Sequence, residues 1–273
     1  PKRERYLQRM IEDARDQGIK TIILHINTDG GYVFSGRDIL KTLLDQAIDG
    51  PRLIAYVDYR AISAGAMIAY GCDEIVLTPS ASIGDIGVIR MMPDGTMEYG
   101  PEKIEAPVRT LLTLCSEVRG WSRGMLLKMT ARNQLLYRVA IDDGYEYIIE
   151  DDWPAYLADH PDIDPDDKQQ VIVFRGEDRL LTLTGKEAVG YDMATTLVDS
   201  KAELLEHLQV DEIDLIDLQP TATEETAWFL SSYAGLFLGL AMLFVFLELK
   251  TAGVGLFATL AAVCGGVFLF TTF

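Results

Sequence analysis

The stretches Thr21 to Gly31 (TIILHINTDGG) and Ala61 to Ala66 (AISAGA) decide the fold expected for this chain. The first is an apolar, β-branched run that ends in a glycine turn, which is typical of a strand buried on both faces. The second follows another apolar run, Leu53 to Val57, and leads into a small-residue helix. Strands that alternate with helices in this way predict a mostly parallel α/β sheet.

The same alternation continues outward from these stretches. Apolar spacing of three and four residues predicts helices over 5–16, from 35 onward, over 102–119, 186–191 and 202–208. Continuous apolar runs predict further strands over 73–77, 171–174, 180–183 and 212–216. Residues 142–167 are strongly acidic and contain prolines, so we expect a surface loop there.

Composition excludes several kinds of partner and site. The 273 residues include 42 acidic and 24 basic side chains, a formal net charge of −18, which argues against a nucleic-acid partner. The three cysteines form no CxxC element, and the three histidines are scattered. We therefore expect no disulfide framework, no metal site and no cofactor.

The last part of the chain changes character. Residues 227–247 and 254–273 carry no charge, and a bilayer core of about 30 Å needs about 20 apolar residues of helix. We expect a first domain over 1–220 and a membrane domain over 221–273 with these two transmembrane helices. Because Lys250 lies between them and acidic residues precede them, the positive-inside tendency predicts an extracytoplasmic first domain, periplasmic in a bacterium.

The ends of the chain also lead to an expectation. It starts at Pro1 without an initiator methionine and stops at Phe273 inside an apolar run. We expect the first domain to lack an N-terminal part and the membrane domain to be truncated at its C-terminal end.

Ser63 stands where a strand ends and a helix starts, among small residues. Its neighbours leave room for a substrate backbone, and a helix start offers backbone N–H groups that stabilise an oxyanion. The alternative is that Ser63 simply caps the helix. The Gly30–Gly31 pair follows the apolar run that starts at Thr21. Glycines there let backbone N–H groups turn toward the same cleft, so the N–H groups of Gly31 and Ala64 form a candidate oxyanion hole. The alternative is an ordinary strand-to-helix turn.

The segments TIILHINTDGG and AISAGAMIAYGCDEIVLTPSASIGDIGVI (residues 61–89) together resemble the ClpP/crotonase superfamily. Within it, the chain resembles the signal-peptide peptidase A and NfeD groups of membrane serine proteases. The run RLLTLTGKEAVGYDMATTLVDS (residues 179–200) and the order of protease domain before membrane helices resemble the long NfeD form, the presumed partner of stomatin-like proteins. The fold class implied is an α/β ClpP/crotonase-like parallel-sheet protease domain followed by transmembrane helices.

The resemblance implies a serine endopeptidase with a Ser–Lys dyad. In the family the lysine opens a helix downstream of the serine, and Lys103 in Pro101-Glu102-Lys103-Ile104 matches that position. A lysine with a pKa of about 10.4 is protonated, whereas burial in an apolar cleft can lower it to about 7 to 8. Neutral Lys103 would then take the proton of Ser63, and Gly30, Ile62 and Ala66 would line the substrate site.

The resemblance also implies partners. These are a stomatin- or prohibitin-like (SPFH) membrane protein whose apolar segment is cleaved, the lipid bilayer, and further copies in a homo-oligomer.

Two other hypotheses stay open. The second hypothesis is a catalytically inactive membrane scaffold of an SPFH assembly. It is favoured by Asp29, which stands where the family usually has a proline and adds negative charge beside the site. The third hypothesis is a crotonase-like acyl-CoA enzyme, which uses paired backbone N–H groups for a thioester oxyanion. The apolar C-terminal runs and the Ser63 and Lys103 pair argue against it.

Overall fold

The computed structural model describes residues 2–272 apart from 48, 93, 143, 176–178, 219 and 252–254. The described chain divides into two compact units, Arg3–Leu215 and Ile216–Phe273. The two units are described separately below, beginning with the larger.

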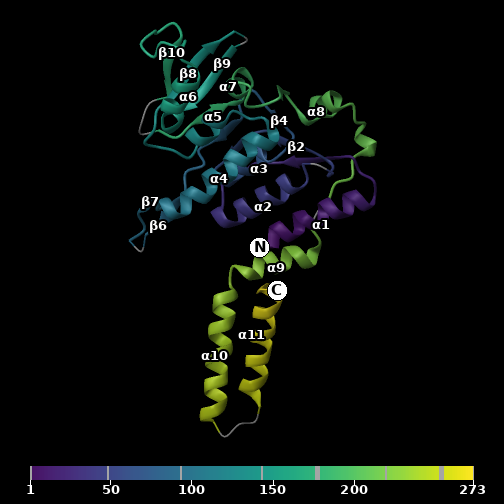
Figure 1. Ribbon diagram of the computed structural model, residues 1–273. Helices are drawn as coiled ribbons and strands as arrows, with labels where there is room; N and C mark the ends of the chain where they lie inside the picture. Colours follow the sequence, from purple (N-terminus) through teal and green to yellow (C-terminus); the bar gives the residue numbers. More distant parts are fainter. Residues whose placement is uncertain are drawn as a thin grey trace. The chain divides into compact units, whose positions relative to one another are not determined.

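The centre of the first unit is a four-stranded sheet. It contains β1 (Thr21–His25), β2 (Arg52–Val57), β4 (Glu74–Leu77) and β12 (Thr196–Leu197) in the order β1-β2-β4-β12. All three strand pairings are parallel, as the alternation of strands and helices predicts. Figure 1 shows helices packed against this sheet.

Both faces of the central sheet are covered, because successive residues of a strand point to opposite sides. One face buries Leu53, Ala55 and Val57 against α1 (Lys2–Asp16), α2 (Val33–Asp45) and α3 (Ala64–Tyr70). The opposite face buries Ile54 and Tyr56 against Leu204 of α8 (Lys201–Leu208). Burial on both sides explains why β2 is apolar at nearly every position.

A second, three-stranded sheet supports the start of α3. β3 (Arg60–Ile62) runs parallel to β5 (Ser82–Gly84), and β11 (Thr182–Thr184) pairs with β5 in the antiparallel direction. α7 (Gly185–Gly190) follows β11 directly, and the Thr184 side chain caps it in a capping box with Glu187. The LTLTGKEA segment is therefore a strand-to-helix unit that holds β5 in place.

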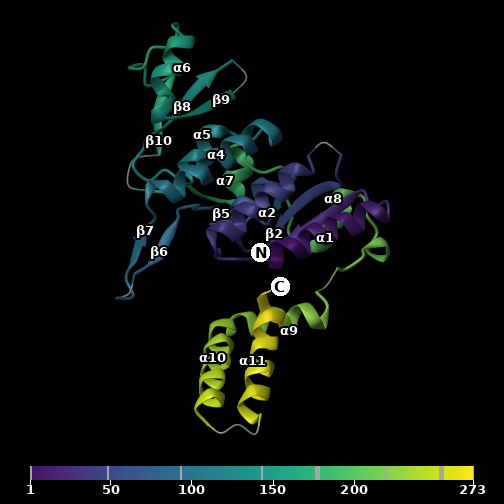
Figure 2. The same ribbon diagram turned by 60° about the horizontal axis from the view of Figure 1, so that its bottom comes forward.

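A β-hairpin connects this sheet to the next helices. β6 (Ile89–Met91) pairs with β7 (Met97–Tyr99), and α4 (Glu102–Arg119) and α5 (Arg123–Lys128) follow. Figure 2 shows the hairpin extending away from the central sheet.

The expectation of a surface loop over 142–167 was correct only for its second part: residues 160–167 contain no helix or strand and are exposed except for Ile163, whereas residues 144–159 form a strand and helices. β8 (Leu136–Ile141), β9 (Gly144–Ile149) and β10 (Val171–Arg175) form an antiparallel sheet, and η1 (Glu150–Asp152) and α6 (Trp153–Asp159) lie within the acidic stretch. Val139 and Ile163 are buried together, and Trp153 stacks on Tyr137 with ring centroids 4.5 Å apart. This local apolar cluster stabilises structure that the acidic composition conceals.

The strand expected over 212–216 is also absent. The residues form a 3₁₀ turn, η2 (Glu212–Asp214). Ile213 is 91% exposed, so its apolar side chain has no sheet face to bury against.

The second unit consists of α9 (Ala222–Ser231), α10 (Ala234–Lys250) and α11 (Leu256–Thr272). The span expected over 227–247 is not one helix, because the chain bends by 68° between Ser231 and Ala234. The Ser231 hydroxyl donates to the Trp228 carbonyl at 2.6 Å, a side-chain contact with the backbone of the kind found at helix bends.

The length of these helices also differs from expectation. α10 and α11 each have 17 residues and therefore rise about 25 Å, less than a bilayer core of about 30 Å. Among the described helices none is by itself long and apolar enough for a crossing, whereas α9 and α10 as a bent pair meet that criterion in length and composition.

Candidate functional site

Ser63 occupies a backbone conformation that L-residues rarely adopt. Its φ is 56° and its ψ is −118°, between the end of β3 and the first residue of α3. Two hydrogen bonds hold it there: its N–H donates to the Gly84 carbonyl at 3.0 Å, and its carbonyl accepts from the Met67 N–H at 3.1 Å. A conformation of this kind persists only where the surroundings enforce it, and such residues cluster at functional sites.

The turn that contains Gly30 packs directly against Ser63. Thr28 donates to the Arg60 carbonyl at 2.9 Å and accepts from the Ile62 N–H at 3.1 Å, which ties the turn to β3. Gly30 has a φ of 123°, and a Cβ added to it would lie 2.8 Å from the Ser63 Cβ. Only glycine fits this position, both for its backbone conformation and for the space available.

The candidate oxyanion hole has suitable donors. Within the part of the chain that the structure describes, the N–H groups of Gly31 and Ala64 have no hydrogen-bond partner. The Ala64 amide is at the first residue of α3, where the helix leaves its N–H groups unpaired. Both amides belong to backbone segments that flank Ser63, so this arrangement is suited to stabilising negative charge that develops beside the hydroxyl.

Asp29 is paired with a cation. Its Oδ1 lies 2.6 Å from Arg60 Nη1, and the Arg60 guanidinium also lies over the Tyr59 ring, 4.7 Å from its centroid. The negative charge that Asp29 adds beside the glycine pair is therefore balanced by Arg60 three residues before Ser63. The sequence pattern did not reveal this pair, because it joins the glycine turn to the first residue of β3.

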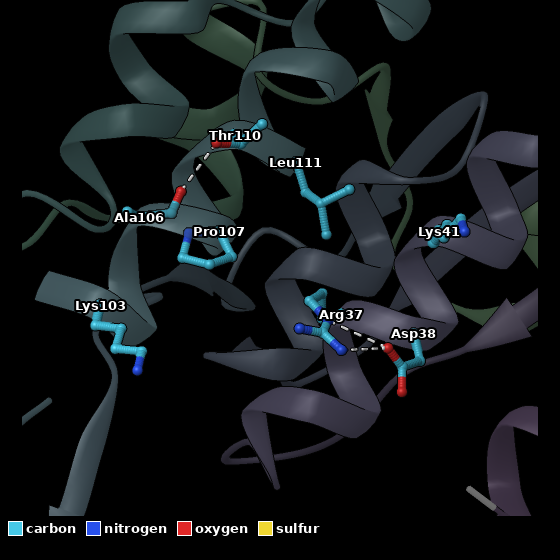
Figure 3. Close-up of a pocket in the computed structure, with 8 residues that line it drawn as sticks. All are labelled: Arg37, Asp38, Lys41, Lys103, Ala106, Pro107, Thr110 and Leu111. Atoms are coloured by element: carbon cyan, nitrogen blue, oxygen red, sulfur yellow. Dashed lines mark hydrogen bonds and ion pairs between the residues drawn. The ribbon is translucent and has the colours of Figure 1, made fainter. Parts of the chain in front are cut away.

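Lys103 lies in the first turn of α4, and its side chain is exposed. It lines an open groove between α2 and α4, and Figure 3 shows its side chain at one end of that groove. No hydrogen bond between Lys103 and Ser63 exists among the described residues, and Ser63 does not line the groove. The structure thus brings Gly30 against Ser63, whereas no hydrogen bond joins Lys103 to Ser63 among the described residues.

The two ends of α4 differ in how they are attached. Near its C-terminal end, Arg119 donates to the carbonyls of Gly71 and Leu43, both at 3.0 Å, and pairs with Asp73. Near its N-terminal end, Pro107 has no N–H to donate to the Lys103 carbonyl four residues earlier. The turn that carries Lys103 is therefore separated from the anchored part of α4 by a missing backbone hydrogen bond.

A histidine–aspartate pair lies on the other face of the central sheet. His25 Nε2 is 3.0 Å from Asp58 Oδ2, and the His25 ring stacks on Tyr56 with centroids 5.3 Å apart. Tyr56 belongs to the α8 face, whereas α3 covers the opposite face. This geometry argues against His25 as the base for Ser63.

The residues expected to bind substrate differ in accessibility. Ile62 and Ser63 are half-buried, whereas Ala66 is fully buried in the core and lines no open surface. The β6–β7 hairpin carries exposed apolar side chains that sequence reasoning did not single out: Ile89, Met91, Met97 and Tyr99. Alternation of apolar residues with Arg90 and Glu98 is the signal that would have indicated them.

Comparison with known proteins gives one family-model match and several curated relatives. Residues 3–99 match the family model described as the NfeD1b N-terminal domain. The Membrane protein NfeD1b of Bacillus subtilis is 26% identical over 253 residues, which is 92% of this chain and 48% of that protein. The chain thus spans about half the length of this relative. An Enterococcus faecium protein named as a signal peptide peptidase SppA is 29% identical over 87 residues, 32% of this chain and 25% of that protein.

Among solved structures, the 1510-N membrane-bound stomatin-specific protease of Pyrococcus horikoshii is similar in fold. A mutant of it in complex with a substrate peptide superposes with a TM-score of 0.54 at 16% identity, covering 83% of this chain and 90% of that one. The described first unit therefore has the α/β fold of that protease domain.

Proposed function

We propose that this chain, whose residues 3–99 match the NfeD1b N-terminal domain, is a membrane-anchored serine endopeptidase. Ser63 is the nucleophile, Lys103 is its base, and the amides of Gly31 and Ala64 form the oxyanion hole. The observation that carries the proposal is the enforced left-handed conformation of Ser63 at a strand-to-helix turn. A nucleophile on such a turn is exposed beside helix-start N–H groups.

The chemistry follows from these groups. Neutral Lys103 accepts the proton as Ser63 Oγ bonds to a peptide carbonyl carbon, and the resulting oxyanion accepts hydrogen bonds from the two amides. The intermediate collapses, the C–N bond breaks, and the leaving amine takes the proton from Lys103. Water then attacks the ester carbonyl, with Lys103 again as base, and releases the acid and Ser63.

The relatives support a serine–lysine pair and a membrane-protein substrate. The solved forms of the 1510-N protease include a serine-to-alanine and a lysine-to-alanine mutant, and one holds a substrate peptide. By this likeness the substrate is an apolar segment of a stomatin-like (SPFH) protein, and the enzyme acts as a homo-oligomer. The apolar α10 and α11 anchor it in the bilayer, with the first unit extracytoplasmic.

Catalysis requires Lys103 to approach Ser63. Movement of the first turn of α4 is the smallest change that provides this, because Pro107 weakens the connection of that turn to the anchored helix. In this proposal the dyad assembles when substrate or partner binds.

A second candidate function rests on the missing hydrogen bond between Lys103 and Ser63. Lys103 is exposed and forms no hydrogen bond with Ser63 in the described chain. A protein that kept this arrangement permanently would be a non-catalytic scaffold for an SPFH assembly.

One experiment separates the two functions. The full chain in detergent or lipid is incubated with the C-terminal segment of a stomatin-like protein and, separately, with a fluorophosphonate probe. Wild type should cleave and label, Ser63→Ala should do neither, and Lys103→Arg should fail because a guanidinium stays protonated. Lys201→Ala, an exposed lysine on α8, is the control and should behave as wild type.

The outcomes are distinct. Cleavage by Lys103→Arg at the wild-type rate would remove Lys103 from the mechanism. Absence of both labelling and cleavage in wild type, with partner present, would favour the scaffold.

A further inference from the structure

A groove lies between α2 and α4, near the start of α3. It has a volume of about 650 Å³, which is in the range of ligand sites. Figure 3 shows that α2 forms one wall and the first half of α4 forms the other. Its lining residues are Arg37, Asp38, Lys41, Lys103, Ala106, Pro107, Thr110 and Leu111.

The groove is cationic in a strongly acidic chain. Arg37 and Lys41 are four residues apart on α2, so they lie on one side of that helix, and Lys103 comes from α4. The only carboxylate in the lining belongs to Asp38, which pairs with Arg37 at 3.0 Å. Lys41 and Lys103 form no ion pair with any residue in the described ranges. A groove of this charge in a chain of net charge −18 is complementary to an anionic ligand.

The groove also has an apolar part. Ala106, Pro107 and Leu111 form it along α4, and the exposed Phe34 ring lies beside the Arg37 guanidinium, 5.4 Å from its centroid. The shape therefore suits a segment in which a carboxylate stands next to an apolar side chain.

The groove is close to Ser63 through α2. A Cβ added to Gly36 would lie 2.8 Å from the Ala64 Cβ, so α2 contacts the helix start beside Ser63 at this point. Arg37 is the next residue along α2. A peptide lying in the groove would thus be separated from Ser63 by no more than α2.

We infer that this groove binds an acidic and apolar peptide segment that flanks the cleaved bond of the substrate, with its carboxylates held by Arg37 and Lys41. The inference rests on the proposed function and names part of its substrate class. Charge selects the segment, the apolar wall accepts a neighbouring side chain, and both position the chain across the start of α3.

The test measures binding without cleavage. Full-length Ser63→Ala protein in zwitterionic detergent is titrated with a fluorescent leucine-rich peptide that ends in two glutamates, and with the same peptide ending in two glutamines. The glutamate peptide should bind about tenfold more tightly, since each exposed ion pair adds about 1 kcal/mol or less. Adding Arg37→Gln and Lys41→Gln should abolish the difference, whereas Lys186→Gln and Lys201→Gln should preserve it.

Several outcomes would overturn the inference. Equal affinity for both peptides is one, and an unchanged preference in the Arg37→Gln, Lys41→Gln protein is another. A third is that anionic lipid in the micelles displaces both peptides equally and that this displacement requires Arg37 and Lys41. In that case the groove binds lipid headgroups instead. Circular dichroism of each variant verifies that α2 remains folded.

The binding test also distinguishes this inference from the proposed function. If the glutamate peptide binds more tightly but wild type never cleaves either peptide, the groove assignment is supported and the protease proposal is wrong. If wild type cleaves both peptides with equal kcat/KM and binding shows no preference, the protease proposal stands and the groove assignment fails.

Discussion

At the scale of single residues, Ser63 and Gly30 depend on each other. Ser63 and Gly30 both have a positive φ, and the Ser63 side chain lies against Gly30 where a Cβ would otherwise stand. Each conformation is unfavourable for a residue with a side chain, so the pair is held by the hydrogen bonds of Thr28 and Gly84.

Gly30→Ala should destabilise the first unit by about 1 to 3 kcal/mol, because the added Cβ would meet Ser63 and the φ suits glycine alone. It should also remove fluorophosphonate labelling. Gly31→Ala is the matched control, since nothing lies within 4 Å of its added Cβ, and its thermal midpoint should stay near that of wild type. Unfolding followed by near-UV circular dichroism gives both values, and equal losses in the two variants would contradict this account.

Glu105 provides a pH-dependent prediction. Burial raises its pKa above the ordinary 4.5, and the attraction of Arg109 offsets this only in part. The folded state therefore holds the proton more tightly than the unfolded state, so stability should fall as pH rises from 4.5 through the raised pKa. Glu105→Gln should raise the thermal midpoint at neutral pH and leave it unchanged below pH 4.5.

Glu117→Gln controls for the loss of a carboxylate from the exposed side of α4. A gain for Glu105→Gln that is the same at acid and neutral pH would contradict the assignment to burial.

At the scale of elements, α4 combines an anchored end with a weakened first turn. Arg119 attaches the C-terminal end of α4 to α2 and α3, and Pro107 interrupts the backbone hydrogen bonds of the first turn. The same helix therefore forms core through Val108, Leu112 and Cys115 while it presents Lys103 to solvent.

Pro107→Ala should stabilise α4, by at most about 3 kcal/mol, because it restores a donor for the Lys103 carbonyl. If movement of this turn brings Lys103 to Ser63, cleavage should become slower as stability rises. Thr110→Ala lines the same groove without changing the backbone and should leave turnover unaltered. A stabilised Pro107→Ala protein with wild-type turnover would show that this turn stays in place during catalysis.

At the scale of the whole molecule, the two units differ in what they bury. The first has a core that draws residues from the four-stranded sheet, the β11-β5-β3 sheet and six of its helices. In the second, α10 buries no residue among those described, and it exposes large apolar side chains such as Leu236, Met242 and Phe246. Helices of this composition need an apolar environment, either a bilayer or a protein partner.

Residues 1–215 produced as a separate protein should fold and stay soluble without detergent, because the core of the first unit contains no residue of the second. Size-exclusion chromatography and a cooperative thermal transition would verify this. Aggregation of that fragment would show that the first unit depends on α9 to α11.

Sequence by itself determined the alternation of strands and helices, the glycine turn before Ser63 and the apolar C-terminal runs. These are local patterns: a buried strand, a glycine that only a special turn requires, and an uncharged helix are each recognisable within a short window.

The tertiary structure decided what depends on distant parts of the chain. The Asp29–Arg60 pair, the packing of Gly30 on Ser63 and the groove that holds Lys103 beside α2 all join segments with no shared local pattern. The strands β8 and β9 escaped prediction because their acidic surroundings outweigh the small apolar cluster in composition, whereas β10 matches the strand expected over 171–174. The bend after Ser231 was missed because hydropathy measures how apolar a run is, whereas its continuity as a helix depends on backbone hydrogen bonds.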